Sequence, residues 1–349
     1  MNRVENLRKQ FSDREAVYIT SFANIFYYSG FQSDDGALLI SHDKAILITD
    51  SRYTVQAAVQ SPDFEVHNIT EGLQSIVSVF SGMSIGYEED YLTMAHFQTL
   101  QETLPNGAEL VPMQKKISAL RQVKDEAEIA HIREAERIGD EAFSYVLPRI
   151  RPGVSEREIA LEIEFFMKKQ GATALSFDTI CASGVRSAMP HGVATEKRIE
   201  TGDFVTLDFG CVFEGYCSDM TRTVVVGKAD TRQKEIYDIV LRAQLAAIDA
   251  LAQGKRCVDI DAVARNLITE AGFGKEFGHS LGHSVGIEIH EAPSLSPKSE
   301  AVLTAGNVIT VEPGIYVSGF GGVRIEDLLV VGEGKNENLT HSTKELLIV

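Results

Sequence analysis

No stretch of this sequence has the features of an export or membrane segment. The first residues, MNRVENLRKQFSDRE, are charged and have no apolar centre, so no signal peptide is expected. No uninterrupted apolar run approaches the roughly 20 residues that a membrane-spanning helix needs. No CxxC pair occurs, so we expect reduced thiols in a cytoplasmic protein and no cysteine-ligated metal at Cys181, Cys211, Cys217 and Cys257.

Positive charge is also scarce. Lys and Arg number 33 against 50 Asp and Glu, which gives a formal net charge of −17. Such a balance does not suit the phosphates of a nucleic acid, so no nucleic-acid partner is expected. Hydrophobic residues make up 44% of the chain, as in ordinary globular proteins. A length of 349 residues is too great for one ordinary core, so two domains are expected.

Several catalytic motifs are missing, and one that is present lacks its context. HExxH, GxxxxGK and GxGxxG do not occur. The serine-hydrolase pattern GxSxG occurs twice, at residues 278–282 and 282–286, and Asp327 and His341 follow in the order of a catalytic triad. That motif needs a strand before it and a helix after it. Here AGFGKEF precedes it, and GIEIHEAP alternates and ends in proline, so a serine hydrolase is not favoured.

The N-terminal part has the pattern of a small α/β domain. Runs rich in Ile, Leu, Val and Tyr predict strands at residues 16–20 and within 36–49, and helices are expected at 51–60 and 91–104. The Pro105-Asn106-Gly107 loop signal indicates that a domain ends soon afterwards. We therefore divide the chain into residues 1–118 and 119–349.

The remainder shows one order of elements twice. A helix pair is expected at residues 126–147 and 155–171, and a strand pair at 204–210 and 217–226. About one hundred residues later a second helix pair is expected at 234–252 and 258–271, and a second strand pair at 307–312 and 323–331. The repeated ααββ unit predicts a pseudo-twofold α+β domain.

Each expected strand pair carries acids where a core should be. Alternation places Asp208 on the face opposite Val205, Leu207 and Phe209. If the chain folds back through residues 213–215, Asp208 and Asp219 come to lie nearly opposite each other. Directly opposed residues have Cβ atoms about 4.5–5.5 Å apart, so two like charges there destabilise a hairpin unless they are neutralised.

The second strand pair repeats this arrangement, because Glu312 and Glu326 are equidistant from Gly319. A bound cation would neutralise both acid pairs. One shared proton per pair, as in aspartic proteases, is an alternative. A different register with solvated acids is another, and spacing alone leaves all three open.

Three histidines favour the metal. His279, His283 and His290 lie within the glycine-punctuated segment 278–293. One imidazole among four carboxylates makes an oxygen-rich site that suits manganese, cobalt(II) or iron(II), with catalytic zinc as an alternative. Two bridging and two terminal carboxylates would hold two metals about 3.5–4 Å apart.

These motifs match a known family. DFG, SDMTRT, GHSVGIEIHEAP, EPGIY and GGVRIED, with SAMPHG upstream, resemble the pita-bread metallopeptidases, in particular the proline-specific branch of prolidase and aminopeptidase P. The likeness covers roughly residues 120–349, and ITDSRYTVQA is similar to the creatinase-type N-terminal domain of the same proteins. Methionine aminopeptidases usually lack such a domain, and creatinases lack the metal ligands, whereas all five ligand positions are filled here.

The resemblance implies a role for each matching residue. The implied metal ligands are Asp208, Asp219, His283, Glu312 and Glu326, with Asp219 and Glu326 as the bridging pair. The implied catalytic residues are His191, His290 and Glu312, and the implied proline pocket consists of His279, Tyr316 and Arg324. For the pocket, Arg324 pairing with a metal carboxylate, Tyr316 as a strand aromatic and His279 as a structural hydrogen-bond partner remain alternatives.

The implied activity is hydrolysis of the N-terminal Xaa-Pro bond by attack of a metal-bridging hydroxide, with Glu312 as general base and His290 as donor to the oxyanion. His191 would contact the substrate near the scissile bond. The implied cofactor is two divalent metal ions per subunit, manganese first, with cobalt, iron or zinc as alternatives. A homodimer is expected, without a membrane partner. The alternative function, a non-catalytic peptide- or protein-binding module, predicts lost ligands. Dipeptidase and aminopeptidase activity are not distinguished.

Overall fold

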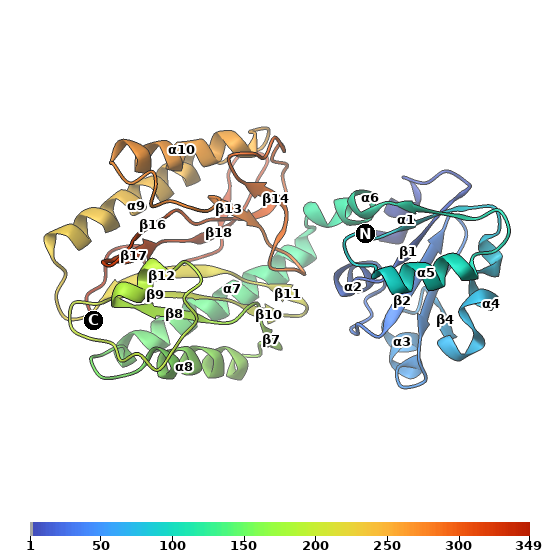
Figure 1. Ribbon diagram of the computed structural model, residues 1–349, viewed down its shortest axis with the longest axis horizontal. Helices are drawn as coiled ribbons and strands as arrows, with labels where there is room; N and C mark the ends of the chain where they lie inside the picture. Colours follow the sequence, from blue (N-terminus) through green and yellow to red (C-terminus); the bar gives the residue numbers. More distant parts are fainter. Residues whose placement is uncertain (1–2) are drawn as a thin grey trace. The chain divides into compact units, whose positions relative to one another are not determined.

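The structure, a computed structural model, describes residues 3–349 and divides after Arg121 into two compact units (Figure 1). Within the described residues, every helix is too short or too polar to cross a membrane.

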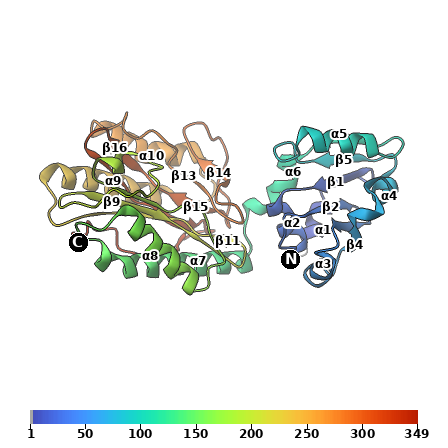
Figure 2. The same cartoon turned by 60° about the horizontal axis from the view of Figure 1, so that its bottom comes forward.

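The first unit is built on a mixed six-stranded sheet with the order β4-β3-β2-β1-β5-β6. Figure 2 shows four of these strands from top to bottom in the reverse order: β5, β1, β2 and β4. The strands β1, β2 and β3 pair antiparallel, and the outer pairs are parallel. The strands are β1 (Glu15–Ile19), β2 (Gly36–Ser41), β3 (Ala45–Thr49), β4 (Glu65–Asn68), β5 (Ser84–Tyr87) and β6 (Glu109–Pro112).

The helices of this unit are α1 (Arg3–Arg8), α2 (Phe22–Ser29), α3 (Thr54–Gln60), α4 (Leu73–Val77), α5 (Met94–Thr103) and α6 (Gln114–Ser118). The expected helices at 51–60 and 91–104 are present but start three residues later than predicted. The start of α5 has a clear cause, because the Thr93 side chain accepts a hydrogen bond from the His96 N–H and caps the helix there. The α/β character predicted for this part is confirmed.

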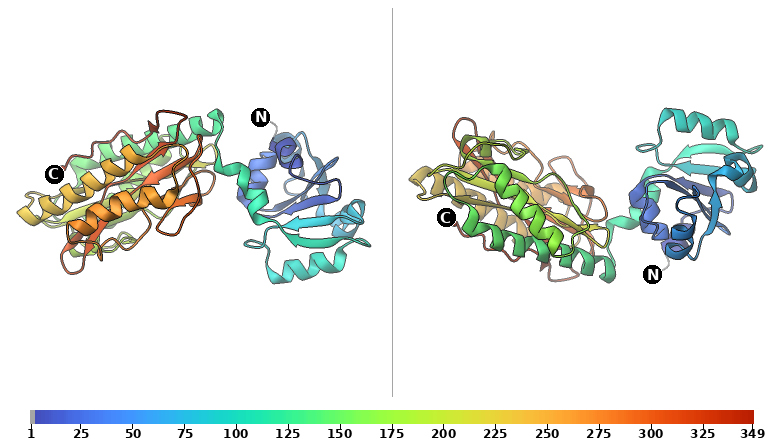
Figure 3. Two further views of the ribbon diagram at one scale, coloured as in Figure 1. Left: turned by 90° about the horizontal axis from the view of Figure 1, so that it is seen from above. Right: turned by 90° about the horizontal axis from the view of Figure 1, so that it is seen from below.

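The second unit has two helix pairs with strands between them. The helices are α7 (Glu126–Val146), α8 (Glu156–Lys169), α9 (Thr231–Ala250) and α10 (Cys257–Glu270). Figure 3 shows α9 and α10 in front of the strands from one side, and α7 and α8 in front from the other. The order helix pair, strands, helix pair, strands confirms the predicted α+β repeat.

The strands of this unit form short sheets that meet at its centre. The first half holds β7 (Ala174–Leu175), β8 (Ile180–Ser183), β9 (Phe204–Phe209), β10 (Cys211–Phe213), β11 (Tyr216–Cys217) and β12 (Met220–Val225). The second half holds β13 (Gly282–Ser284), β14 (Glu291–Leu295), β15 (Val308–Val311), β16 (Gly314–Val317), β17 (Gly321–Arg324), β18 (Asp327–Val330) and β19 (Glu337–Asn338).

Capping boxes begin three of the four helices, as the pattern at Ser155 and Glu158 predicts for α8. The helices α7 and α8 cover an apolar cluster that includes Val205, Leu207 and Phe209 of β9. The alternation predicted for β9 is therefore confirmed, and Asp208 lies on the opposite face, toward the interior between the two halves.

The predicted register of the first acid pair is wrong by two residues. Asp208 pairs with Thr221, so Asp219 is not directly opposite it. The hairpin turns on two residues, Glu214 and Gly215, which both have positive φ (48° and 82°) and let pairing continue to Phe213 and Tyr216. Asp219 consequently lies diagonally across from Asp208.

The register predicted for the second acid pair is confirmed. Gly314 pairs with Arg324 on one side of the pair, and Val311 pairs with Asp327 on the other. The β15–β18 and β16–β17 pairs thus share one register, centred on Gly319. Glu312 and Glu326 lie between these two pairs, each at the same distance from Gly319. The expected continuous strand at 323–331 is interrupted there, because the Glu326 N–H donates to the Thr221 carbonyl oxygen instead.

Candidate metal centre

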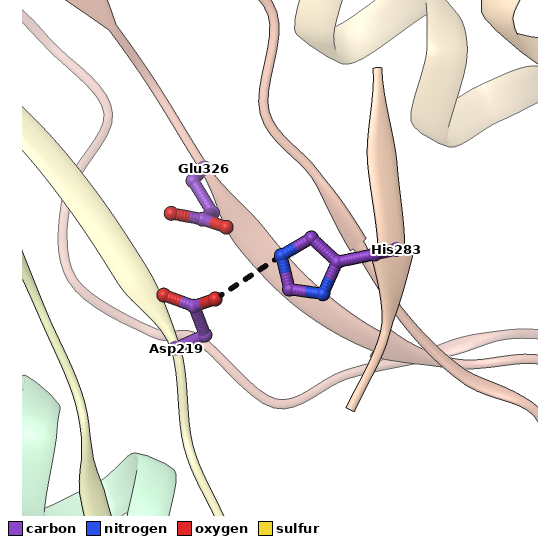
Figure 4. Close-up of side chains that lie close together, drawn as sticks. All are labelled: Asp219, His283 and Glu326. Atoms are coloured by element: carbon purple, nitrogen blue, oxygen red, sulfur yellow. Dashed lines mark ion pairs between the residues drawn. The ribbon is translucent and has the colours of Figure 1, made fainter. Parts of the chain in front are cut away.

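Acidic and imidazole side chains from both halves of the second unit meet at its centre. Asp219 precedes β12, His283 lies in β13 and Glu326 lies between β17 and β18. One ligand atom from each of the three lies within 4.8 Å of the others, and Figure 4 shows the side chains directed at one another. Asp219 and Glu326 lie more than one hundred positions apart in the sequence, with His283 between them, and the fold brings all three together.

Asp208 and Glu312 complete this group. The His283 Nε2 lies 3.5 Å from Asp219 Oδ2 and 3.5 Å from Glu312 Oε1. All five residues line one cavity of about 350 Å³. Asp208 is buried, and within the described residues its Oδ1 has no hydrogen-bond partner. An unpaired buried carboxylate oxygen that faces a cavity is costly unless a cation or a donor occupies that cavity.

Crowding shifts the acidity of the group. Burial, followed by repulsion from Glu326 and then Asp208, raises the pKa of Asp219 well above its ordinary range. Burial, followed by repulsion from Asp208, raises the pKa of Glu326 to about 8, and burial with repulsion from Glu326 raises that of Glu312. Burial lowers the pKa of His283 to about 4, so this imidazole is neutral near pH 7.

The donor set fits divalent metal ions. Carboxylates that repel one another when ionised, next to a neutral imidazole, are stabilised by a cation that replaces their protons. The oxygen-rich set suits manganese, cobalt(II) or iron(II), and it also accommodates catalytic zinc. The ligand roles of the individual residues remain predictions.

The raised pKa values predict how pH affects the metal-free protein. Between pH 4.5 and about 8 the folded chain holds a proton on Glu326 that the unfolded chain releases, so this group lowers stability as pH rises through that window. A metal replaces the proton and removes this loss. We expect excess Mn²⁺ to raise the Tm more at pH 8 than at pH 5.5, as measured by calorimetry of chelator-treated protein. An equal or smaller gain at pH 8 would contradict the shifted acidity.

The predicted proline-pocket residues form one hydrogen-bonded group beside the acids. The Arg324 Nη1 donates to the Tyr316 hydroxyl at 2.7 Å, and that hydroxyl lies 2.9 Å from His279 Nε2. The Arg324 Nη2 also pairs with Asp208 Oδ2. The alternative interpretation of Arg324, pairing with a ligand carboxylate, thus describes a real contact, and the guanidinium makes it while also contacting Tyr316.

The two predicted catalytic histidines line the same cavity. The His290 ring lies 4.4 Å from the His283 ring, measured between centroids. His191 follows a short 3₁₀ turn, η5 (Gly184–Ala188), on an irregular segment. Burial and the nearby His191 lower the pKa of His290, so a neutral imidazole is available there to donate one hydrogen bond.

Ser280 and Ser284, the serines of the GxSxG matches, do not form a nucleophile elbow. Ser284 lies in β13, and the chain then runs through an irregular segment into β14. Ser284 is fully buried, and within the described residues its hydroxyl oxygen has no hydrogen-bond partner. The sequence context of the GxSxG matches did not favour a serine hydrolase, and the position of Ser284 agrees with that interpretation.

Several site residues were missed at the sequence level. Apolar side chains of Phe177, Ile180 and Ile289 line the cavity. The Thr221 hydroxyl donates to Glu326 Oε2 at 2.6 Å, and Glu136 accepts from the Asp219 N–H at 3.2 Å. Glu136 could have been identified from the sequence, because it is an acid on the apolar face of the α7 helix. The others follow from tertiary contacts that no local pattern reports.

Comparisons with known proteins agree with this geometry. The sequence matches the family described as metallopeptidase family M24 over residues 130–333, and the creatinase/prolidase N-terminal domain over residues 3–123. An uncharacterized peptidase, YqhT, of Bacillus subtilis is 44% identical, over 99% of this chain and all of its own length. An Xaa-Pro dipeptidase of Pyrococcus horikoshii is 39% identical, over 95% of this chain and 94% of its own.

Solved structures are similar over the whole length. An Xaa-Pro dipeptidase from Bacillus anthracis has 46% sequence identity and a TM-score of 0.95, with 99% of each chain covered. An X-Pro aminopeptidase from Thermotoga maritima has 39% identity and a TM-score of 0.93, with all of each chain covered.

Proposed function

Because the chain belongs to metallopeptidase family M24, with a creatinase/prolidase N-terminal domain, we propose that it hydrolyses the Xaa-Pro bond at the N-terminus of dipeptides or short peptides. The family and the fold class predicted from the motifs, a pita-bread domain after a creatinase-type domain, are confirmed. The names of its relatives support the choice of proline. The observation that carries the proposal is the single cavity lined by all five predicted ligands and both predicted histidines.

The proposed metal ligands are Asp208, Asp219, His283, Glu312 and Glu326, with Asp219 and Glu326 shared between two ions. Two divalent ions held by these residues would supply Lewis acidity and lower the pKa of a bound water. Two observations support this assignment: Oδ1 of Asp208 has no hydrogen-bond partner within residues 3–349, and the acids repel one another. We propose manganese as the metal.

The side chains around this set have separate proposed tasks. Glu312 accepts the proton of the attacking water, since its carboxylate faces both His283 and the cavity. His290 donates a hydrogen bond to the oxygen that gains charge, an interaction typically worth about 10²–10³ in kcat. His191, which lines the same cavity, contacts the substrate near the scissile bond.

Proline is selected by shape in this proposal. An Xaa-Pro bond has no N–H, so a pocket cannot recognise the proline nitrogen by a hydrogen bond. The group of His279, Tyr316 and Arg324 offers instead a wall of rings and a guanidinium that are already hydrogen-bonded to one another. Such a preformed wall accepts a rigid ring without reorganising.

We also propose that residues 119–349 form the catalytic domain after an N-terminal domain of residues 1–118, and that the protein acts as a cytoplasmic homodimer. The alternative, a non-catalytic binding module, predicts lost ligands, and all five are present in the sequence.

The substrate class is tested with matched peptides. We expect the Mn²⁺-loaded protein to hydrolyse Leu-Pro, Leu-Pro-Gly or both, with kcat/KM at least about tenfold above that for Leu-Ala. The ratio between the first two peptides then distinguishes dipeptidase from aminopeptidase. Failure to cleave either proline peptide would overturn the proposed function, and equal cleavage of Leu-Ala would overturn the proline preference.

A further inference from the structure

The segment that carries His191 has little regular structure of its own. It leaves β8 at Ser183, passes through η5 and continues to Thr195 as irregular chain, apart from an isolated bridge between Val193 and Ile180. The side chains of Val185, Met189 and Val193 are exposed, so apolar burial of these three does not hold it in place. Residues 183–195, here called the His191 segment, therefore need another source of order.

One buried carboxylate contacts both ends of the His191 segment. Glu156 is the first residue of α8 and is fully buried. At one end, its carboxylate accepts from the Ser183 N–H at 2.7 Å and from the Ser183 hydroxyl at 2.9 Å. At the other end, it accepts from the Thr195 N–H at 3.1 Å and from the Thr195 hydroxyl at 2.7 Å. The carboxylate closes the segment into a loop.

Arg186 supplies the opposite charge and a second cross-link. Its Nε lies 3.0 Å from Glu156 Oε2 and 3.2 Å from Oε1. Its Nη2 donates to the Val193 carbonyl oxygen at 2.8 Å, which ties the outgoing arm of the segment to the returning one. Both oxygens of Glu156 thus have several donors, which is what a buried carboxylate requires.

The other side of the segment contacts the candidate metal centre. The Pro190 carbonyl oxygen accepts from Arg324 Nη1 at 3.2 Å, and the Ser187 hydroxyl accepts from the Gly322 N–H at 2.8 Å. Gly322 has no room for a side chain, since a Cβ there would lie 2.3 Å from the Ser187 carbonyl oxygen. The segment is therefore held from the α8 side by Glu156 and from the cavity side by β17.

We propose that Glu156 is a positioning residue that fixes the His191 segment, and through it the His191 ring, against the metal centre. This inference rests on the proposed function, because it uses the role assigned to His191. Glu156 also lies three and four residues before the buried Ile159 and Ala160, on the apolar face of α8. A buried acid on an apolar helix face needs partners for its charge, and Glu156 finds them in the His191 segment. The helix cap does not need Glu156, because Glu158 forms the capping box with Ser155.

The first test measures order without activity. In Glu156→Gln the amide nitrogen cannot accept a hydrogen bond, and the charge opposite Arg186 is lost. We expect amide hydrogen exchange to become at least about tenfold faster in residues 184–195 than in wild type, with little change in α9 and α10. The control is Glu162→Gln, on the same helix and about half exposed. Unchanged exchange in residues 184–195 would overturn the positioning role, whatever the substrate.

The second test asks whether the effect passes through His191. We expect Glu156→Gln to lower kcat on Leu-Pro about 10–100-fold, since a misplacement of about 1 Å can cost 10²-fold. The KM and the Mn²⁺ affinity should stay within about twofold of wild type. In a His191→Ala background the same change should lower kcat by less than about twofold. An equal loss in both backgrounds, or a loss of metal binding, would overturn the proposal.

A milder variant keeps the test valid if Glu156→Gln folds poorly. Thr195→Val removes one donor to Glu156 and leaves the charge pair with Arg186 intact. We expect a smaller effect of the same kind, about threefold on kcat, that again disappears in the His191→Ala background. An inactive wild type would instead count against the proposed function, and the exchange measurement would still decide the role of Glu156.

Discussion

Replacing Glu312 with alanine is expected to lower kcat/KM on an Xaa-Pro dipeptide by about 10⁴-fold or more and to weaken Mn²⁺ binding at the same time. Its Oε1 lies 3.5 Å from His283 Nε2, and its carboxylate lines the cavity with the other acids. Proton transfer by a positioned carboxylate typically contributes about 10²–10⁴-fold. Loss of a ligand also removes part of the Lewis acidity, so both effects combine.

A second substitution separates the two roles of this residue. Glu312→Gln keeps one oxygen that can bind a metal, but an amide cannot accept the proton of water. We expect most of the metal affinity to remain and most of the turnover to be lost. The control is Glu300→Ala, an exposed acid in the same unit. Turnover of Glu312→Ala close to wild type would contradict the assignment, and so would full metal binding.

The second large effect is on stability. Lys124→Met is expected to destabilise the second unit by about 3–5 kcal/mol, because it removes a buried positive charge that lies against a buried carboxylate. The Lys124 Nζ lies 2.9 Å from Glu291 Oε2, and the two side chains are only 1% and 4% exposed. The other oxygen, Glu291 Oε1, accepts from the N–H groups of Ile287 and Glu288. The pair therefore also holds the loop that leads to His290.

Urea unfolding of metal-loaded protein measures this effect. Lys228→Met, at an exposed lysine of the same unit, is the control and should change stability by less than about 0.5 kcal/mol. The double variant Lys124→Met with Glu291→Gln should recover part of the loss, since the buried charge is gone from both sides. A loss below about 1 kcal/mol for Lys124→Met would show that the pair is not desolvated as the structure has it.

The sequence predicted the second acid pair better than the first for a physical reason. Glu312 and Glu326 are placed symmetrically about Gly319, a flexible residue that marks the middle of its turn. The first hairpin turns on Glu214 and Gly215. A glutamate at φ 48° is uncommon, so the residue types alone do not indicate that the turn is centred between these two residues. A shift of two residues keeps side chains on the same face, so Asp208 and Asp219 still reach one cavity.

Other features could not be read from local patterns at all. The contact of Arg324 with both Asp208 and Tyr316 depends on how β9, β16 and β17 pack together. The same holds for Phe177, which enters the cavity wall from an irregular segment. Buried acids on the apolar faces of α7 and α8, Glu136 and Glu156, were visible in the sequence as exceptions to the helical pattern. An acid on an apolar helix face indicates a specific contact, because charged residues are rarely buried without a partner.

The central claim is a two-metal hydrolytic site, and metal titration of the chelator-treated protein tests it most directly. We predict that the metal-free protein does not cleave Leu-Pro. Mn²⁺ should bind at two ions per chain by calorimetry, and activity should rise as these sites fill. Cleavage that persists in excess chelator, or the absence of any divalent-ion binding at neutral pH, would contradict this account.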